Sequence, residues 1–208
     1  MKAFIYTGGA IDPSNITEHP KGDDLRIAAD SGYRNALALG ETPDLLLGDF
    51  DSLGDCEIPK KVERLQVPAE KDFTDTQLAV DTALKKGATE IVILGGLDGR
   101  LDHTLSNLAI LEDLNEKRIH AVITNGFNRV RYLHATSTLL ARSGFRYVSL
   151  LALSEKVKGV SIEGCKYPLK NATLNRNFQY AVSNEITGNC ALISVRKGGV
   201  YIVESREP

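Results

Sequence analysis

The sequence has no long apolar run and no excess of charge of either sign. Its 208 residues hold 25 Lys and Arg against 27 Asp and Glu, a formal net charge of −2. Because binding to nucleic-acid phosphates needs a basic surface, a strongly basic nucleic-acid binder is excluded. No apolar run approaches the roughly 20 residues that cross a bilayer. The polar start is not typical of a signal peptide, so we expect a cytoplasmic protein without a membrane partner.

The motifs of several common sites are also missing. The three cysteines are scattered and none lies in a C-x-x-C pair, which argues against a disulfide framework or a zinc site. There is no G-x-x-x-x-G-K-[ST] phosphate loop, and no G-x-G-x-x-G follows the first apolar run. The H-E-x-x-H metal motif is absent, and because G-x-S-x-G is absent too, covalent nucleophile chemistry has little support.

Up to residue 127, short apolar runs alternate with helical patterns. Nearly unbroken runs between helices are typical of buried parallel strands, and they predict an open, mostly parallel α/β sheet with flanking helices. The runs are 4–7, 25–29, 45–47, 91–94 and 121–124, with a weaker one at 64–67. Three helices are predicted, over 32–39, over 75–86 and over 103–117, and their predicted caps are Ser31, Thr74 and Asp102.

From residue 128 the apolar pattern changes to a period of two. The alternating segments are 130–134, 147–153, 157–162, 178–182, 191–195 and 200–203. Turn residues such as Gly144, Gly164 and Gly198 lie between these segments. This pattern predicts an antiparallel sandwich or barrel-like domain. We therefore expect two domains, an α/β domain over 1–127 and a β-sandwich over 128–208.

Aspartates follow the predicted strands of the first domain. Ligands of open α/β sheets bind beyond the carboxyl ends of the strands, so these side chains are expected at one edge. They are Asp30, Asp49, Asp51, Asp72, Asp75, Asp98 and Asp102. Carboxylates this dense suit Mg²⁺, which prefers hard oxygen ligands. We expect Asp49, Asp51 and Asp75 to bind the metal, and Lys71 and Arg100 to meet phosphate.

Each of these residues, taken alone, also has a simpler role. Asp30 and Asp102 can cap helices, and Asp49 and Asp51 can form a turn. His103 can be a hydrogen-bonded residue at a helix start. Because several separate loops on the same predicted edge carry Asp, we favour a functional site. From the residues alone, the sequence predicts a Mg²⁺-dependent enzyme that acts on phosphates.

The ordered set of these segments resembles the thiamine pyrophosphokinase (thiamine diphosphokinase) family, of the bacterial type. The matching segments are Ala29-Asp30-Ser31-Gly32, Pro43-Asp44, Gly48-Asp49-Phe50-Asp51-Ser52, Lys71-Asp72-Phe73-Thr74-Asp75, Gly95-Gly96, Gly99-Arg100-Leu101-Asp102-His103 with Asn107, and Ser183-Asn184-Glu185. They cover nearly the whole chain. The resemblance implies a homodimer with active sites at the subunit interface, and the reaction of ATP with thiamine to give thiamine diphosphate and AMP, with Mg²⁺.

The resemblance also implies roles for individual residues. Metal and phosphate binding falls to Asp49, Asp51 and Asp75. The nucleotide side comprises Asp30, Ser31, Lys71, Thr74, Arg100, Asp102, His103 and Asn107. Thiamine is expected to meet Ser183 and Asn184 of the partner subunit, with Lys71 and Asp75 also on the substrate side. We expect Asp75 or Asp102 to accept the proton of the thiamine hydroxyl.

Two questions stay open, the aromatic partner of thiamine and the function itself. The chain has no Trp, whereas animal proteins resembling this family place a Trp against thiamine, so the aromatic partner is not identified. A different Mg²⁺-dependent phosphotransferase or phosphohydrolase acting on a small alcohol is one alternative function. A non-catalytic sensor of nucleotide or thiamine is another. Formation of AMP only in the presence of the acceptor distinguishes the three.

Overall fold

The apolar runs of the first half of the chain are strands of one parallel sheet. The computed structural model describes residues 1–51, 56–67 and 72–207, in two units: Met1–Gly126 and a second that begins at Phe127. In the first unit the strand order is β4-β3-β2-β1-β5-β6, and all five strand pairs are parallel. The strands are Lys2–Tyr6 (β1), Leu25–Ala29 (β2), Leu45–Gly48 (β3), Glu63–Gln66 (β4), Glu90–Leu94 (β5) and His120–Thr124 (β6).

Strand β1 lies in the middle of this sheet and pairs with both β2 and β5. Ile5 is in register with Ile27 on one side and with Ile93 on the other, and all three side chains are fully buried. The chain adds β2, β3 and β4 on one side of β1 and then crosses to add β5 and β6 on the other. Such a reversal leaves a crevice beyond the carboxyl ends of the two central strands, where ligands of α/β proteins bind.

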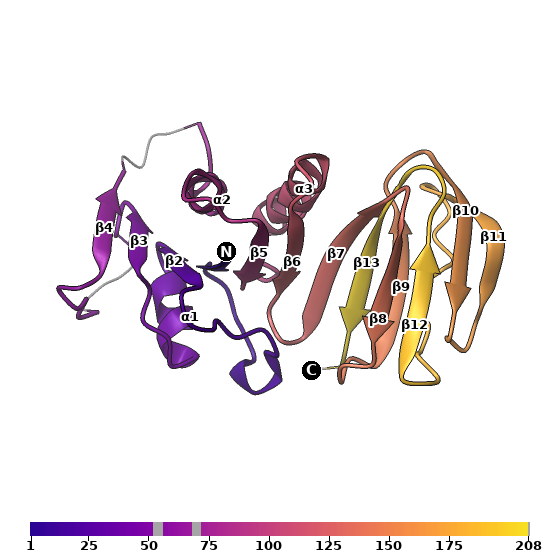
Figure 1. Ribbon diagram of the computed structural model, residues 1–208, viewed down its shortest axis with the longest axis horizontal. Coiled ribbons are helices and arrows are strands. Elements are labelled where there is room, and N and C mark those ends of the chain that lie inside the picture. The colour runs from indigo at the N-terminus through magenta and orange to yellow at the C-terminus, as the bar shows by residue number, and fades with distance from the viewer. Residues whose placement is uncertain (52–55, 68–71, 208) are drawn as a thin grey trace. The chain divides into compact units, whose positions relative to one another are not determined.

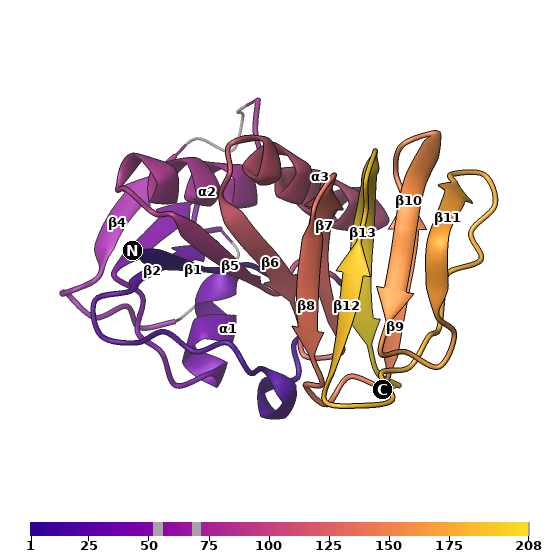
Figure 2. The same ribbon diagram turned by 45° about the vertical axis from the view of Figure 1, so that its right-hand side comes forward.

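In the described part of the chain, three α-helices cover the sheet. They are Gly32–Ala38 (α1), Asp75–Lys85 (α2) and Leu101–Glu116 (α3), and a 3-10 turn lies at Pro13–Asn15 (η1). Helix α1 lies on one face of the sheet, and α2 and α3 lie on the other (Figures 1 and 2). Apolar side chains of each helix, such as Tyr33, Ala79 and Leu111, are buried against it. Among the described residues, no helix is both long and apolar enough to cross a membrane.

The predicted helix caps have different outcomes. Thr74 is confirmed as a cap, because its hydroxyl accepts a hydrogen bond from the Gln77 N–H at 3.2 Å. Ser31 does lie at the N-cap position of α1, but it has helical dihedral angles and its side chain makes no capping hydrogen bond. The Asp102 cap is wrong, because α3 begins at Leu101 after Arg100, so that Asp102 lies in the first turn.

From Phe127 onward the chain forms two antiparallel sheets that enclose one apolar core, as the period-two pattern predicts. The order is β7-β13-β9 in one sheet and β11-β10-β12-β8 in the other. The strands are Asn128–His134 (β7), Ser137–Ala141 (β8), Tyr147–Ala152 (β9), Lys156–Glu163 (β10), Leu169–Asn175 (β11), Cys190–Ser194 (β12) and Gly199–Ser205 (β13). Both sheets contribute to the core, for example Leu150 and Ile202 from one and Val160 and Ile193 from the other. The unit is therefore a β-sandwich.

One predicted strand of the sandwich is wrong. The segment 178–182 alternates apolar residues but forms no strand, and Phe178, Tyr180 and Val182 are all exposed. The strand lies earlier in the chain, at β11, where Leu174 alone is buried. Because β11 is an edge strand with polar residues at most positions, its sequence carries only a weak apolar signal. Strand β8, at the opposite edge of the same sheet, is also absent from the predicted set.

Candidate active site

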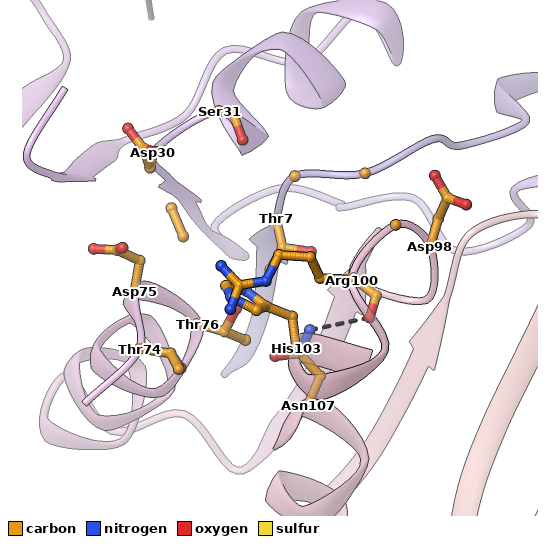
Figure 3. A pocket seen from close by; sticks show the side chains of 15 residues that line it. Thr7, Asp30, Ser31, Thr74, Asp75, Thr76, Asp98, Arg100, His103 and Asn107 are labelled. Carbon is orange, nitrogen blue, oxygen red and sulfur yellow. Dashed lines mark hydrogen bonds between the residues drawn. The ribbon is translucent and has the colours of Figure 1, made fainter. Parts of the chain in front are cut away.

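A pocket of about 380 Å³ lies in the first unit, beyond the carboxyl ends of β1 and β5 (Figure 3). This is the crevice at which the strand order reverses. Its lining residues come from the loops after β1, β2 and β5 and from the starts of the helices. They are Thr7, Gly8, Gly9, Ala29, Asp30, Ser31, Thr74, Asp75, Thr76, Gly96, Asp98, Gly99, Arg100, His103 and Asn107.

Two glycine pairs meet beside this pocket, Gly8-Gly9 after β1 and Gly95-Gly96 after β5. The Gly96 N–H donates to the Gly8 carbonyl at 2.9 Å, which joins the two loops. Gly95 has a φ of +100°, and a Cβ atom there would lie 2.6 Å from the Thr7 carbonyl oxygen. A side chain at this position would therefore collide with backbone, so the close approach of the loops depends on glycine.

Each of the three helices contributes its start to the pocket. Ser31 directly precedes α1, Thr74 caps α2, and Arg100 directly precedes α3. The N-terminus of a helix carries partial positive charge and unpaired N–H groups, which attract phosphate. Asp75 in the first turn of α2 adds a half-buried carboxylate to the same lining. The pocket thus combines donors for phosphate with an acidic side chain.

Arg100 and Asp102 form an exposed ion pair at the pocket's rim. Arg100 donates to both carboxylate oxygens of Asp102, from Nη2 at 2.5 Å and from Nε at 3.1 Å. This hydrogen bonding lowers the pKa of Asp102 and raises that of Arg100. Arg100 lines the pocket, whereas Asp102 is not among the lining residues. The arrangement keeps the Arg100 guanidinium charged at the pocket, with the Asp102 carboxylate as its counter-charge.

The structure brings seven of the residues predicted for the site together in this pocket. They are Asp30, Ser31, Thr74, Asp75, Arg100, His103 and Asn107. Asn107 is buried, and its side-chain amide donates to the Gly96 carbonyl at 3.0 Å (Figure 3). Asn107 therefore holds the second glycine loop from within α3.

Asp49 and Asp51 follow β3 but are not among the lining residues. They form a turn in which the Asp51 N–H donates to Asp49 Oδ1 at 3.1 Å. Within residues 1–51, 56–67 and 72–207, no group of three or more His, Cys, Asp or Glu side chains is placed to hold a metal ion. The predicted set of Asp49, Asp51 and Asp75 stays a prediction. Lys71 lies outside the described residues.

The two predicted thiamine residues lie in the second unit. Ser183 is exposed, and its N–H donates to the Ser149 hydroxyl at 3.0 Å. Asn184 is buried, and its side chain bonds the Tyr167 backbone through both its oxygen, at 2.9 Å, and its amide, at 2.8 Å. Asn184 also lines a cavity of about 110 Å³ together with Tyr167 and Tyr180. The Asn184 side chain therefore fixes the Tyr167 segment.

Sequence reasoning missed several residues of the pocket. Thr7 and Thr76 line the pocket but belong to none of the predicted site segments. The sequence marks Asp98 only as one of seven aspartates at the predicted edge of the sheet. The Asp98 carboxylate accepts a hydrogen bond from the Ala10 N–H at 3.1 Å, which ties the loop after β5 to the loop after β1. A conspicuous glycine pair next to Thr7 was the one available signal.

The fold and the pocket together define a class of protein. Its α/β domain has a pocket lined by helix N-termini and glycine loops at a topological switch point, and a β-sandwich follows. Comparison with known families agrees with this order. Residues 18–123 match the thiamin pyrophosphokinase catalytic domain, and residues 136–200 match the thiamin pyrophosphokinase vitamin B1 binding domain.

Individual relatives match over the full chain. The chain is 30% identical to thiamine pyrophosphokinase of Bacillus subtilis (strain 168), with 100% of both sequences covered. The crystal structure of the Bacillus subtilis thiamine pyrophosphokinase has a TM-score of 0.87 at 26% identity, covering 100% of both chains. That of the Geobacillus thermodenitrificans thiamin pyrophosphokinase has a TM-score of 0.83 at 25% identity, covering 100% of this chain and 98% of the other. The chain belongs to the thiamine pyrophosphokinase family.

Proposed function

We propose that this chain transfers the pyrophosphoryl group of ATP to the hydroxyl of thiamine, giving thiamine diphosphate and AMP. The observation that carries the proposal is the pocket beyond the carboxyl ends of β1 and β5, where three helix starts and two glycine loops converge in a chain of this family. Its volume of about 380 Å³ lies in the usual range for small-molecule sites, roughly 300–1,000 Å³.

The triphosphate is proposed to lie against the Gly8-Gly9 loop and the helix starts. Glycine lets phosphate oxygens approach the backbone, and the helix N-termini favour negative charge. The guanidinium of Arg100 is a further donor at the rim. Because phosphoryl-type transfer depends mainly on positioning and charge neutralisation, these groups can supply most of the catalysis. Asp30, Ser31, Thr74 and His103 complete the proposed nucleotide side.

Asp75 is the better candidate of the two carboxylates for the proton of the thiamine hydroxyl. It lines the pocket, whereas Asp102 does not. Both oxygens of Asp102 are bonded to Arg100, and this bonding lowers its pKa. A carboxylate with a lowered pKa is a weaker base. We therefore assign the proton to Asp75 and assign Asp102 to orienting Arg100.

The acidic side chains suit Mg²⁺, which is proposed as the metal of the reaction. Mg²⁺ commonly keeps several waters and binds through one or two carboxylates plus substrate phosphates, so it does not require a preformed cage of three protein ligands. Asp49 and Asp51 are proposed as ligands, together with one carboxylate oxygen of Asp75, whose other oxygen stays available for the proton. Bound Mg²⁺ neutralises charge on the phosphate oxygens. Replacing Asp49 by Asn is expected to lower kcat by several orders of magnitude without unfolding the chain, and full activity of that variant would contradict its role.

The homodimer, the partner-subunit role of Ser183 and Asn184, and a cytoplasmic location are proposals that rest on the family resemblance. Sedimentation equilibrium tests the first of them, with a mass twice that of the 22.7 kDa chain expected. Because the Asn184 side chain is hydrogen-bonded to the backbone of Tyr167 and Glu185, its proposed role is to fix the backbone of the thiamine-binding segment.

Product analysis tests the proposed function. The protein is incubated with Mg-ATP and thiamine, and each component is omitted in turn. We expect AMP and thiamine diphosphate in equal amounts, and only in the complete mixture. Inorganic phosphate released from ATP without thiamine would indicate a phosphohydrolase. Nucleotide binding with no product at all would indicate a sensor.

A further inference from the structure

Asn35 ties helix α1 to the loop that follows β1. Its side-chain amide donates two hydrogen bonds, to the Thr7 carbonyl at 2.7 Å and to the Gly9 carbonyl at 2.9 Å. Asn35 is half-buried in the middle of α1, and it is not among the residues that line the pocket. Its contacts reach the pocket only through the backbone of the Thr7–Gly9 segment.

Every carbonyl of this segment is held by a protein donor. Between the two bonds to Asn35, the Gly8 carbonyl accepts from the Gly96 N–H at 2.9 Å. In a trans peptide the N–H points opposite to the C=O, so fixing each carbonyl also fixes the direction of the following N–H. The Ala10 N–H follows the Gly9 carbonyl and meets the Asp98 carboxylate at 3.1 Å, as this rule requires. The directions of the Gly8 and Gly9 N–H groups are set in the same way.

These bonds matter because the segment contains two adjacent glycines. A Gly-Gly sequence has a wide choice of backbone conformations and loses more entropy on ordering than other residues. Gly8 and Gly9 have no side chain that could hold their backbone in place. The amide of Asn35, anchored on a helix, supplies this constraint before any ligand binds. When the loop is already ordered, the entropy cost of ordering it does not reduce the free energy of ligand binding.

We propose that Asn35 is a positioning residue, whose amide holds the Thr7–Gly9 backbone in the conformation that receives the triphosphate of ATP. The inference rests on the proposed function for the identity of the ligand. It assigns no direct contact between Asn35 and substrate. Loss of the amide therefore weakens binding of the phosphates and leaves recognition of the nucleoside and of thiamine unchanged.

The variant Asn35→Asp tests this proposal, because it keeps the shape of the side chain and removes both donors. Affinity is measured by titration calorimetry with α,β-methylene ATP, which cannot undergo transfer, and with adenosine. We expect at least a tenfold weaker affinity for α,β-methylene ATP and less than a twofold change for adenosine. In steady-state kinetics the KM for ATP is expected to rise at least tenfold, with the KM for thiamine within twofold of wild type.

Matched variants separate positioning from general damage. Asn115→Asp makes the same chemical change in α3, away from the pocket lining, and is expected to behave as wild type. Asn35→Ala removes the amide without adding charge and is expected to show the same selective loss. Asn35→Gln retains an amide donor at a longer reach and is expected to recover part of the affinity. Wild-type affinity in Asn35→Asp, or equal losses for α,β-methylene ATP and adenosine, would overturn the proposal.

Hydrogen exchange on the wild-type protein gives a second measurement that needs no variant. Binding of α,β-methylene ATP is expected to slow exchange of the amides at 8–10 more than adenosine does. Equal exchange with both ligands would overturn the proposal. A wild type that makes no thiamine diphosphate, with Asn35→Asp still losing affinity for the analogue, would contradict the proposed function and leave the role of Asn35 standing.

Discussion

Arg129 and Glu204 face each other across β7 and β13 and form a buried ion pair. Arg129 donates to the two carboxylate oxygens of Glu204, from Nε at 2.9 Å and from Nη2 at 2.7 Å. Only 5% of Arg129 and 1% of Glu204 are exposed. Arg131 and the Ser143 hydroxyl also bond the Glu204 carboxylate. Two cations and a hydroxyl therefore surround one buried anion inside the sandwich.

Removing one partner of this pair is expected to destabilise the sandwich strongly. Glu204→Gln leaves the buried Arg129 guanidinium without its counter-charge, which costs about 3–5 kcal/mol of the free energy of unfolding. Urea denaturation measures the change. The double variant Arg129→Met with Glu204→Leu replaces the charges by apolar side chains and is expected to recover a large part of the loss. A change below about 1 kcal/mol in Glu204→Gln would contradict the role of the pair.

The same pair predicts a loss of stability in acid. Burial alone would raise the pKa of Glu204, but the hydrogen bond from Arg129 and the charges of Arg131 and Arg129 outweigh it, so the pKa lies below its ordinary value of 4.5. A lowered folded-state pKa contributes stability above the unfolded-state value, and this stability is lost as the pH falls through the folded-state value. Thermal unfolding from pH 7 to pH 3 is expected to show a smaller decline in Glu204→Gln than in wild type. Parallel pH profiles would contradict the assignment.

Two glycines with similar backbone angles but different surroundings test the packing of the pocket loops. Gly95 has a φ of +100° with the Thr7 carbonyl 2.6 Å from a built Cβ, whereas Gly87 has a φ of +87° with open space around it. Both alanine variants incur the strain of a positive φ, about 1–2 kcal/mol. Gly95→Ala is expected to lose about 1–3 kcal/mol more through overpacking. Equal losses in chemical denaturation would show that the two loops can separate freely.

Asp75 and Asp72 offer a matched pair for the acidic side chain of the site. Asp75 lines the pocket at the start of α2, whereas Asp72 is exposed and outside the lining. Asp75→Asn is expected to lower kcat/KM by at least about a hundredfold, the scale of general-base catalysis. The same change at Asp72 is expected to stay within twofold of wild type. Equal effects at the two positions would remove Asp75 from the proposed chemistry.

The central strands of the fold could be predicted from the sequence because both faces of each strand are buried. The run Leu45-Leu46-Leu47 is apolar at every position, and it forms β3. Edge strands lack this signal. In β11 four of the seven side chains are polar and Leu174 alone is buried, while Phe178, Tyr180 and Val182 lie exposed outside any strand. The period of apolar residues therefore predicted the sandwich without predicting all of its strands.

The residues of the site that could be predicted are charged side chains close to the predicted ends of strands or starts of helices. Asp75 is a charged residue at a predicted helix start and Arg100 lies just before another, and the sheet topology brings them to one pocket. Asn35 could not be predicted in this way, because its partner carbonyl at Thr7 is 28 residues away in the sequence. The sequence of a helix does not indicate that one of its asparagines is hydrogen-bonded to a distant loop. Such a contact becomes visible only when α1 is packed beside the end of β1.

The fate of the β-phosphate of ATP tests the central claim most directly. ATP labelled with ³²P at the β position is incubated with thiamine, Mg²⁺ and either wild-type protein or Asp75→Asn. Transfer of pyrophosphate predicts that wild type moves all released label into thiamine diphosphate and leaves unlabelled AMP, while Asp75→Asn moves at least about a hundredfold less label per unit time. Label recovered in ADP or in inorganic phosphate, or equal transfer by the two proteins, would contradict pyrophosphoryl transfer in the pocket beyond the carboxyl ends of β1 and β5.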